Sequence, residues 1–142
     1  MKAPELPTHN ISHLIPQKSP FIMVDTLLDF SENKVSSSFT ILKDNLFVKN
    51  NLFLEPGLIE NMAQTVALHT GYDYFLKGEQ APTGYIGSIK KVSIKTLPKL
   101  NEKITTNVSI LHEFNGVTMV SVSVFKDGLE IASGEMKTVI AS

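Results

Sequence analysis

The chain has 142 residues, 42% of them hydrophobic and 19% charged, which suits one folded domain and excludes a disordered chain. It contains no cysteine, so disulfide bonds, thiolate metal sites and a cysteine nucleophile are excluded. Its formal net charge of -1 gives no electrostatic reason to expect nucleic acid as the main ligand.

Residues 1–10 include Pro4 and Pro7 and lack the apolar stretch of a secretory signal peptide. No later apolar run approaches the roughly 18 residues that are needed to span a bilayer. We therefore expect a cytoplasmic protein with no membrane partner.

Two apolar segments follow Pro20. They are Phe21–Phe30 (FIMVDTLLDF) and Val35–Leu42 (VSSSFTIL), and the polar residues 31–34 separate them. Apolar and β-branched runs that are bounded by a polar turn predict strands. We expect these two segments to pair with each other.

The pattern changes at Pro56, a residue suited to the first turn of a helix. From there to about Phe75, apolar residues recur at helical spacing: Leu58, Ile59, Met62, Ala63, Val66 and Ala67. Before His69 the uncharged polar interruptions are few: Asn61, Gln64 and Thr65. This pattern predicts one long helix that is buried on most sides.

Beyond Gly78, apolar and polar residues alternate, which predicts strands. Asn115-Gly116 and Asp127-Gly128 are typical of tight hairpins, and they separate strands expected over 104–114, 117–125 and 129–140. The sequence shows no internal repeat and no linker, so we predict a single domain over residues 1–142. An apolar helix beside antiparallel strands predicts an α+β fold with a twisted sheet around one central helix.

Three blocks of the sequence resemble the β-hydroxyacyl-acyl-carrier-protein dehydratases: Ile11–Asp25 (ISHLIPQKSPFIMVD), Pro56–Gln64 (PGLIENMAQ) and Tyr85–Leu97 (YIGSIKKVSIKTL). The second block is similar to the Pro-Gly loop and the Glu-x-Met-Ala-Gln signature of that family. The resemblance implies the hot-dog fold, in which a strongly curved antiparallel sheet wraps around one long helix. It also implies a homodimer or larger assembly that binds an acyl carrier protein or coenzyme A thioester. We expect neither a cofactor nor a metal.

One departure from the family pattern bears on activity. Dehydratases of this family carry a catalytic histidine in a His-Phe-Pro-Gly stretch before the helix, whereas residues 49–57 here read KNNLFLEPG. Asn51 is the nearest positional match to that histidine, and an amide cannot act as a general base near neutral pH. The pattern resembles more closely the divergent dehydratase-like proteins of aryl-polyene and flexirubin-type pigment pathways.

Dehydration of a β-hydroxyacyl thioester removes an α-proton and expels the β-hydroxyl, so the site needs a polarised carbonyl and a proton-transfer group. We expect the N–H groups of Gly57 and Leu58 to lack partners at the helix start and to bind the thioester carbonyl. On the signature match, Glu60 is assigned to proton transfer, with Asn51 as the second catalytic candidate. Gln64 follows Glu60 by four residues on the same helix face, as a substrate-site residue.

Each of these assignments has a structural alternative. Glu60 can simply complement the helix dipole, and Asn51 is at least as well suited to a turn. Gln64 either orients Glu60 or satisfies a buried polar group. His69 falls on the helix face opposite Glu60, so we interpret it as a satisfied or exposed helix histidine rather than the missing base.

Residues outside the helix are further candidates for the same chemistry. His112 is expected to face the same side of its strand as Val108 and Ile110, from where it could approach a site across a dimer interface. A group of lysines either attracts the acidic carrier protein or coenzyme A phosphates, or merely solvates a strand edge. Its members are Lys90, Lys91, Lys95 and Lys99.

The leading functional hypothesis is a dehydratase that converts 3-hydroxyacyl thioesters to trans-2-enoyl thioesters in fatty-acid or polyene-type biosynthesis. A second hypothesis is a non-catalytic hot-dog subunit that supports an active dehydratase in a heteromer, because the usual histidine is missing. A third is an acyl thioesterase, since related folds host thioesterases in which a carboxylate activates water.

Overall fold

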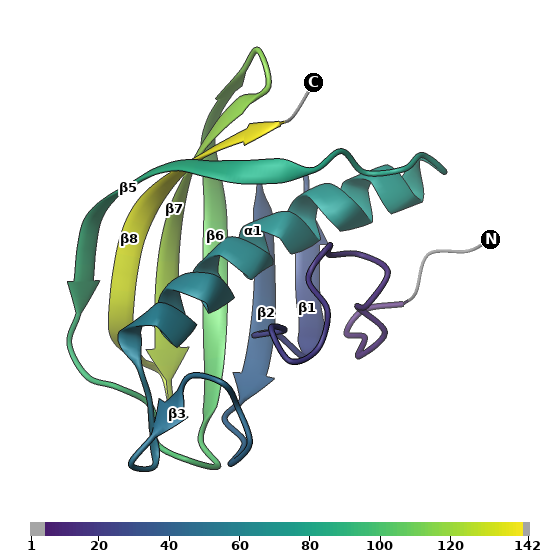
Figure 1. Cartoon of the computed structure of the whole chain (residues 1–142). Helices are drawn as coiled ribbons and strands as arrows, with labels where there is room; N and C mark the ends of the chain where they lie inside the picture. The colour runs from purple at the N-terminus through teal and green to yellow at the C-terminus, as the bar shows by residue number, and fades with distance from the viewer. Residues whose placement is uncertain (1–4, 141–142) are drawn as a thin grey trace.

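The computed structural model describes residues 5–140. Within this range the chain forms one six-stranded antiparallel sheet, a two-stranded ribbon and one long helix that crosses the concave face of the sheet (Figure 1). The strand order in the sheet is β1-β2-β6-β7-β8-β5. The elements are β1 (Thr26–Ser31), β2 (Lys34–Thr40), β3 (Val48–Lys49), β4 (Leu52–Phe53), α1 (Glu55–Leu76), β5 (Gly84–Ile94), β6 (Lys103–Phe114), β7 (Val117–Lys126) and β8 (Leu129–Ile140).

The helix α1 confirms the prediction from helical periodicity. It starts after Leu54, carries Pro56 in its first turn, and gives way to Gly78, whose φ of 69° favours glycine. The polar residues Asn61, Gln64 and Thr65 are fully buried in it, as the all-round apolar pattern led us to expect. No helix within residues 5–140 has the length and apolar character that crossing a membrane would require.

The C-terminal meander β6-β7-β8 also follows the prediction. Asn115 and Gly116 have φ values of 51° and 75°, and Asp127 and Gly128 have 50° and 79°. Two successive positive φ values are the signature of type I′ turns, whose twist matches that of the flanking strands. Local turn chemistry therefore sets the pairing of these three strands.

The first strand begins later than predicted, at Thr26 rather than Phe21. Part of the backbone just before it is bonded to a helix side chain: Gln64 accepts the Met23 N–H at 2.6 Å and donates to the Phe21 carbonyl at 2.8 Å, while the Asp25 N–H still donates to the Ser38 carbonyl on β2. Apolar content alone predicted a strand there, but these long-range bonds use the groups that a ladder would need.

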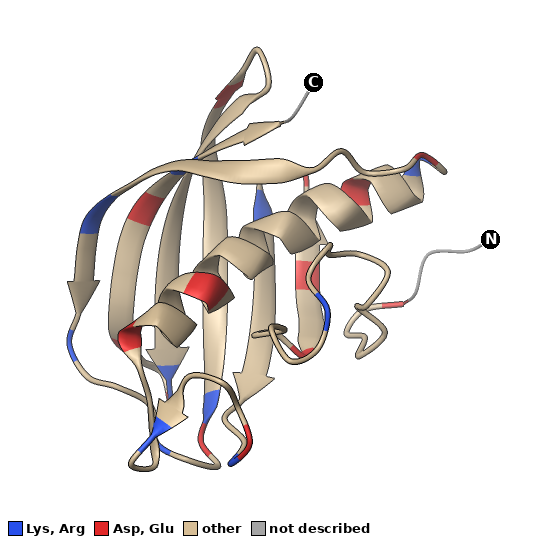
Figure 2. Ribbon diagram, in the orientation of Figure 1, with Lys and Arg blue, Asp and Glu red and all other residues tan. Residues whose placement is uncertain are grey.

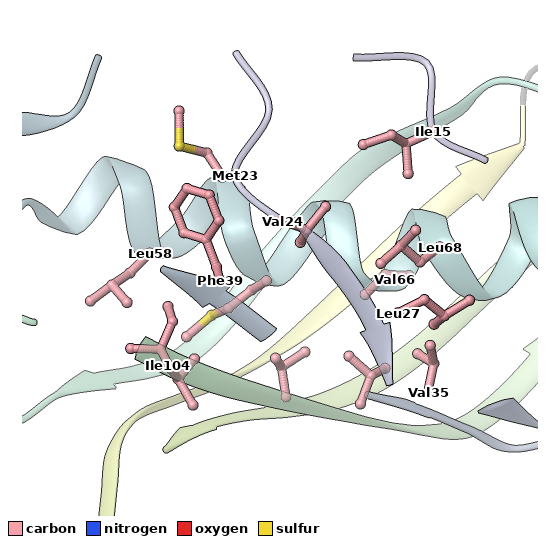
Figure 3. Packing of buried hydrophobic residues seen from close by; sticks show 14 of the residues in the cluster. Ile15, Met23, Val24, Leu27, Val35, Phe39, Leu58, Val66, Leu68 and Ile104 are labelled. Carbon is pink, nitrogen blue, oxygen red and sulfur yellow. The ribbon is translucent and has the colours of Figure 1, made fainter. Parts of the chain in front are cut away.

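The core lies between α1, the sheet and the amino-terminal segment. Figure 3 shows Ile15 and Met23 on one side of the helix, and Val35 and Ile104 on the sheet side. Gly71 allows the segment to cross the helix closely, because an added Cβ would lie 1.8 Å from the Leu14 carbonyl oxygen. The helix is thus covered on two sides by its own chain.

Candidate active site

The start of α1 differs from the expectation that its first amides are free. The N–H groups of Gly57 and Leu58 both donate to the Leu54 carbonyl, at 2.9 and 3.2 Å. Leu54 is extended, with φ -77° and ψ 165°, so it acts as the N-cap residue and its carbonyl accepts the first bonds of the helix. The expectation that these two amides lack partners at the helix start is therefore wrong.

Gly57 has a packing role that the sequence did not reveal. An added Cβ would lie 2.5 Å from ring atoms of Phe53 and 2.9 Å from the Cβ of Phe47. The absent side chain lets the first helix turn sit directly on Phe53, which is fully buried. The positive end of the helix dipole still faces this region.

Glu60 lies half-buried one turn into the helix, and Gln64 is fully buried beside it. Gln64 Nε2 donates to Glu60 Oε1 at 3.1 Å and to the Phe21 carbonyl, while Gln64 Oε1 accepts the Met23 N–H. Both interpretations of Gln64 therefore hold at once: it contacts Glu60, and it satisfies buried backbone groups.

Asn61 belongs to the same buried network, and sequence reasoning gave it no role. Its Nδ2 donates to the Met23 carbonyl at 2.7 Å, and its Oδ1 accepts a bond from the Thr106 hydroxyl on β6. Its position in an otherwise apolar helix could have indicated this role, because a buried polar side chain needs hydrogen-bond partners.

Asn51 lies exposed in the tight turn between β3 and β4, just before α1. Its φ is 62° and that of Asn50 is 53°, and its carbonyl accepts the Leu100 N–H at 2.9 Å. The turn role considered for Asn51 is thus present. Among residues 5–140 no hydrogen bond joins Asn51 to Glu60, whereas one does join Gln64 to Glu60.

The histidines lie away from Glu60. His69 Nε2 bonds the Ser31 carbonyl at 2.9 Å and its ring stacks on Phe30, so it is a satisfied helix histidine. His112 is opposite Met119, whereas Ile110 is opposite Val120, because a bulge lies between them. His112 therefore faces the other side of the sheet from Ile110, contrary to the expected alternation.

Basic residues lie along β5 and near β3 (Figure 2). Lys91 and Lys95 form ion pairs with Glu135 and Glu130, at 3.6 and 3.2 Å. Beside the end where α1 begins, Lys126 bonds Glu102 at 2.7 Å. That bond, with the Lys99 N–H, lowers the pKa of the Glu102 carboxyl, and the same contact raises the pKa of Lys126.

Two surface depressions flank other parts of the sheet. One of about 390 Å³ lies over β1, β2 and β6, and one of about 610 Å³ lies between the β1-β2 turn, the end of α1 and β6. Glu60 lines neither of them. No three His, Asp or Glu side chains gather as metal ligands within residues 5–140.

The architecture matches known hot-dog proteins. A chain of the dehydratase heterocomplex ApeI:P from Xenorhabdus doucetiae superposes with a TM-score of 0.88 at 16% identity, covering 98% of this chain and 93% of that one. An uncharacterized protein, PH1136 from Pyrococcus horikoshii, superposes with a TM-score of 0.70 at 13% identity, covering 97% of this chain and 96% of that one. A hypothetical thioesterase from Streptococcus pneumoniae TIGR4, solved with coenzyme A, superposes with a TM-score of 0.63 at 10% identity, covering 82% of this chain and 84% of that one.

These structural similarities establish the hot-dog fold class that was predicted. No curated protein sequence matches the chain. Residues 9–141 match the family model described as ApeP dehydratase. Because that match spans nearly the whole sequence, the chain belongs to the ApeP-like dehydratase family.

Proposed function

We propose that this chain is a dehydratase subunit that acts on 3-hydroxyacyl groups carried as thioesters by an acyl carrier protein. The observation that carries the proposal is the Glu60 carboxylate, half-buried on the central helix of a dehydratase-family domain and held through one oxygen by Gln64. The product is the trans-2-enoyl thioester, and the class of substrate is that of fatty-acid or polyene-type biosynthesis.

The reaction needs two proton transfers. The α-carbon loses a proton, the C–O bond to the β-hydroxyl breaks, and the hydroxyl leaves as water after it gains a proton. Glu60 can supply the proton to the leaving hydroxyl. The stretch before the helix contains no histidine, and Asn51 is an amide, so this chain lacks the usual second group there. We therefore assign the base that removes the α-proton to a second hot-dog chain.

The sheet offers a surface for that second chain. β5 is the last strand in the strand order, 11 residues long, and several of its apolar side chains are exposed. Their exposed fractions are 62% for Tyr85, 40% for Ile86, 38% for Ile89 and 42% for Val92. A long apolar edge strand that stays uncovered promotes association, so we propose that a second subunit pairs with it.

The identity of the second subunit follows from the missing histidine. A homodimer would bring two copies of the same incomplete site together, whereas a different hot-dog chain can add the absent base. The similar chain from Xenorhabdus doucetiae belongs to a dehydratase heterocomplex, which supports a heteromer. In that assembly, Lys90 and Lys99 can attract the acidic carrier protein, as can the ion-paired Lys91 and Lys95.

Around Glu60 the remaining candidates take supporting roles. The first turn of α1 presents its dipole to the thioester carbonyl, while the Gly57 and Leu58 amides serve the Leu54 carbonyl. We assign to the exposed Asn51 side chain, in the turn before the helix, a hydrogen bond donated to substrate. Gln64 acts through Glu60 rather than on the substrate.

A non-catalytic supporting subunit is the second candidate, favoured by the occupied amides at the helix start. The assay uses the purified chain alone and with the hot-dog subunit that co-purifies with it, supplied with 3-hydroxyacyl carrier protein. Enoyl formation and free thiol are followed together. Glu55, an exposed residue in the first helix turn, provides the matched control.

We expect enoyl product from the assembly, a loss of about 100-fold or more with Glu60→Gln, and no change with Glu55→Gln. Full enoyl turnover with Glu60→Gln would establish the supporting-subunit role instead. Thiol release without enoyl product would show a thioesterase.

A further inference from the structure

A continuous series of hydrogen bonds runs from the sheet to Glu60. The Thr106 hydroxyl donates to Asn61 Oδ1, and Asn61 Nδ2 donates to the Met23 carbonyl at 2.7 Å. The Met23 N–H donates to Gln64 Oε1 at 2.6 Å, and Gln64 Nε2 donates to Glu60 Oε1 at 3.1 Å. Thr106 and Asn61 have no part in the function proposed above.

The direction of each bond is fixed by chemistry. Because the Met23 carbonyl can only accept, Asn61 must turn its Nδ2 group toward Met23, and its Oδ1 is left to accept from the Thr106 hydroxyl. The Met23 backbone N–H can only donate, so Gln64 must offer Oε1 to it. The two hydrogens of Gln64 Nε2 then go to the Phe21 carbonyl and to Glu60. Glu60 Oε1 therefore always receives an N–H.

The series is also buried, which makes it stiff. Asn61, Gln64 and Thr106 are each 0% exposed. Turning any of their polar groups away would leave a buried donor or acceptor without a partner, which is costly at such sites. Figure 3 shows Met23 beside the helix close to Phe39, and both residues belong to the buried apolar cluster.

We propose that Asn61 and Thr106 are positioning residues for Glu60. They hold the backbone of Met23, Met23 fixes the amide of Gln64, and Gln64 occupies Oε1 of Glu60. Oε2 is then the oxygen that exchanges the proton with the substrate, since Oε1 accepts the Gln64 N–H. This inference rests on the proposed function, because it requires Glu60 to be the proton-transfer group.

A second buried bond between the sheet and the helix provides a matched control. The Ser37 hydroxyl on β2 bonds the Thr65 hydroxyl at 2.7 Å, and Thr65 in turn donates to the Asn61 backbone carbonyl at 2.7 Å. Thr65 and Ser37 are as buried as Thr106, and their hydroxyls bond each other and the Asn61 backbone carbonyl rather than the Asn61 side chain or Gln64. Thr65→Val therefore removes a comparable buried bond without disturbing the series to Glu60.

The first test is spectroscopic and needs no activity. The full chain is labelled with ¹³C in its Glu carboxyl carbons, and Glu60→Gln identifies the Glu60 resonance. We expect Thr106→Val and Asn61→Ala to shift the Glu60 resonance, and Thr65→Val to lower Tm while leaving that resonance unchanged. An unchanged Glu60 resonance in folded Thr106→Val, or an equal shift in Thr65→Val, would overturn the positioning role. Because Thr106→Val keeps the side-chain shape, it decides the matter even if Asn61→Ala does not fold.

The second test uses turnover by the assembly. Thr106→Val should lower kcat roughly tenfold to a hundredfold with KM within about twofold, since a displaced proton-transfer group slows chemistry rather than binding. Thr65→Val should leave kcat within about twofold of the unmodified chain. Equal losses in the two variants would contradict the inference. If the unmodified assembly forms no enoyl product, the proposed function fails, and the Glu60 resonance still decides whether the positioning exists.

Discussion

The ladders that join β6 to β7 and β7 to β8 connect strands that are neighbours in sequence and are linked by tight turns, although β6 and β8 also pair with β2 and β5. In the amino-terminal segment of residues 5–25, the backbone is held largely by partners distant in sequence. Asn61 and Gln64 bind Phe21 and Met23, and Leu14 lies against Gly71. The meander therefore depends on local chemistry, and the segment depends on a few contacts with α1. Changes to those few contacts should have larger effects than changes within the meander.

The largest effect is expected from Gly71→Ala. The new methyl group would lie 1.8 Å from the Leu14 carbonyl oxygen, and because that atom is backbone, the segment must move off the helix. We expect the free energy of unfolding to fall by about 3 kcal/mol, measured by urea denaturation. Gly84→Ala is the control, because its nearest neighbour would be at 3.8 Å, and a similar loss there would contradict the account.

Gln64→Ala should lower the free energy of unfolding somewhat less than Gly71→Ala does. The substitution leaves the buried Met23 N–H without its partner and removes the part-buried bond to the Phe21 carbonyl. The expected cost is about 2 kcal/mol, with faster amide hydrogen exchange confined to residues near Met23. Ser121→Ala on β7, a half-buried position in the meander, should stay within about 0.5 kcal/mol. Uniform loss of protection across β6, β7 and β8 would show that the two regions are not separate.

Within the meander, Gly116→Ala should lower the free energy of unfolding by about 1 kcal/mol. Its φ of 75° strains any residue with a Cβ, while the nearest atom to that Cβ would be Ile140 Cβ at 3.9 Å, an ordinary contact. The same change at Gly128, with φ 79° and open space around it, should give an equal loss in thermal unfolding. Clearly unequal losses would mean that packing rather than turn geometry controls these hairpins.

The smallest effect concerns the Glu102 and Lys126 pair. Their contact lowers the pKa of Glu102 from its ordinary 4.5, so the stabilisation is complete above about pH 4.5 and is lost as the pH falls through the lower folded value. The pKa of Lys126 is raised from 10.5, so its contribution is lost only as the pH rises above that value. The Tm of Glu102→Gln should lie slightly below that of the unmodified chain near pH 7 and match it near pH 2. If the Tm difference between Glu102→Gln and the unmodified chain stayed constant from pH 7 to pH 2, the ion pair could not be its source.

The same contrast explains what could be predicted from the sequence. Turn residues such as Asn115-Gly116 and the helical spacing from Pro56 to Phe75 are local signals, and the elements that they indicate are present. The strand was predicted to begin at Phe21, because the sequence does not show that side chains about forty positions away hold Phe21 and Met23. The Leu54 carbonyl likewise occupies the Gly57 and Leu58 amides through a backbone geometry that residue types do not reveal.

For the candidate site, the sequence pointed to Glu60 and Gln64, and the structure brings these two together. It did not point to Asn61 or Thr106, because their meeting depends on how β6 pairs beneath the helix. Side-chain periodicity can predict that a polar residue is buried, but only the three-dimensional register shows which partner it meets.

The most direct test of the central claim is the rate of enoyl formation in a single turnover of 3-hydroxyacyl carrier protein by the assembly. With Glu60→Gln in this chain, we predict a rate about 100-fold or more below that of the unmodified assembly. A rate within about twofold of the unmodified assembly would contradict the assignment of proton transfer to Glu60.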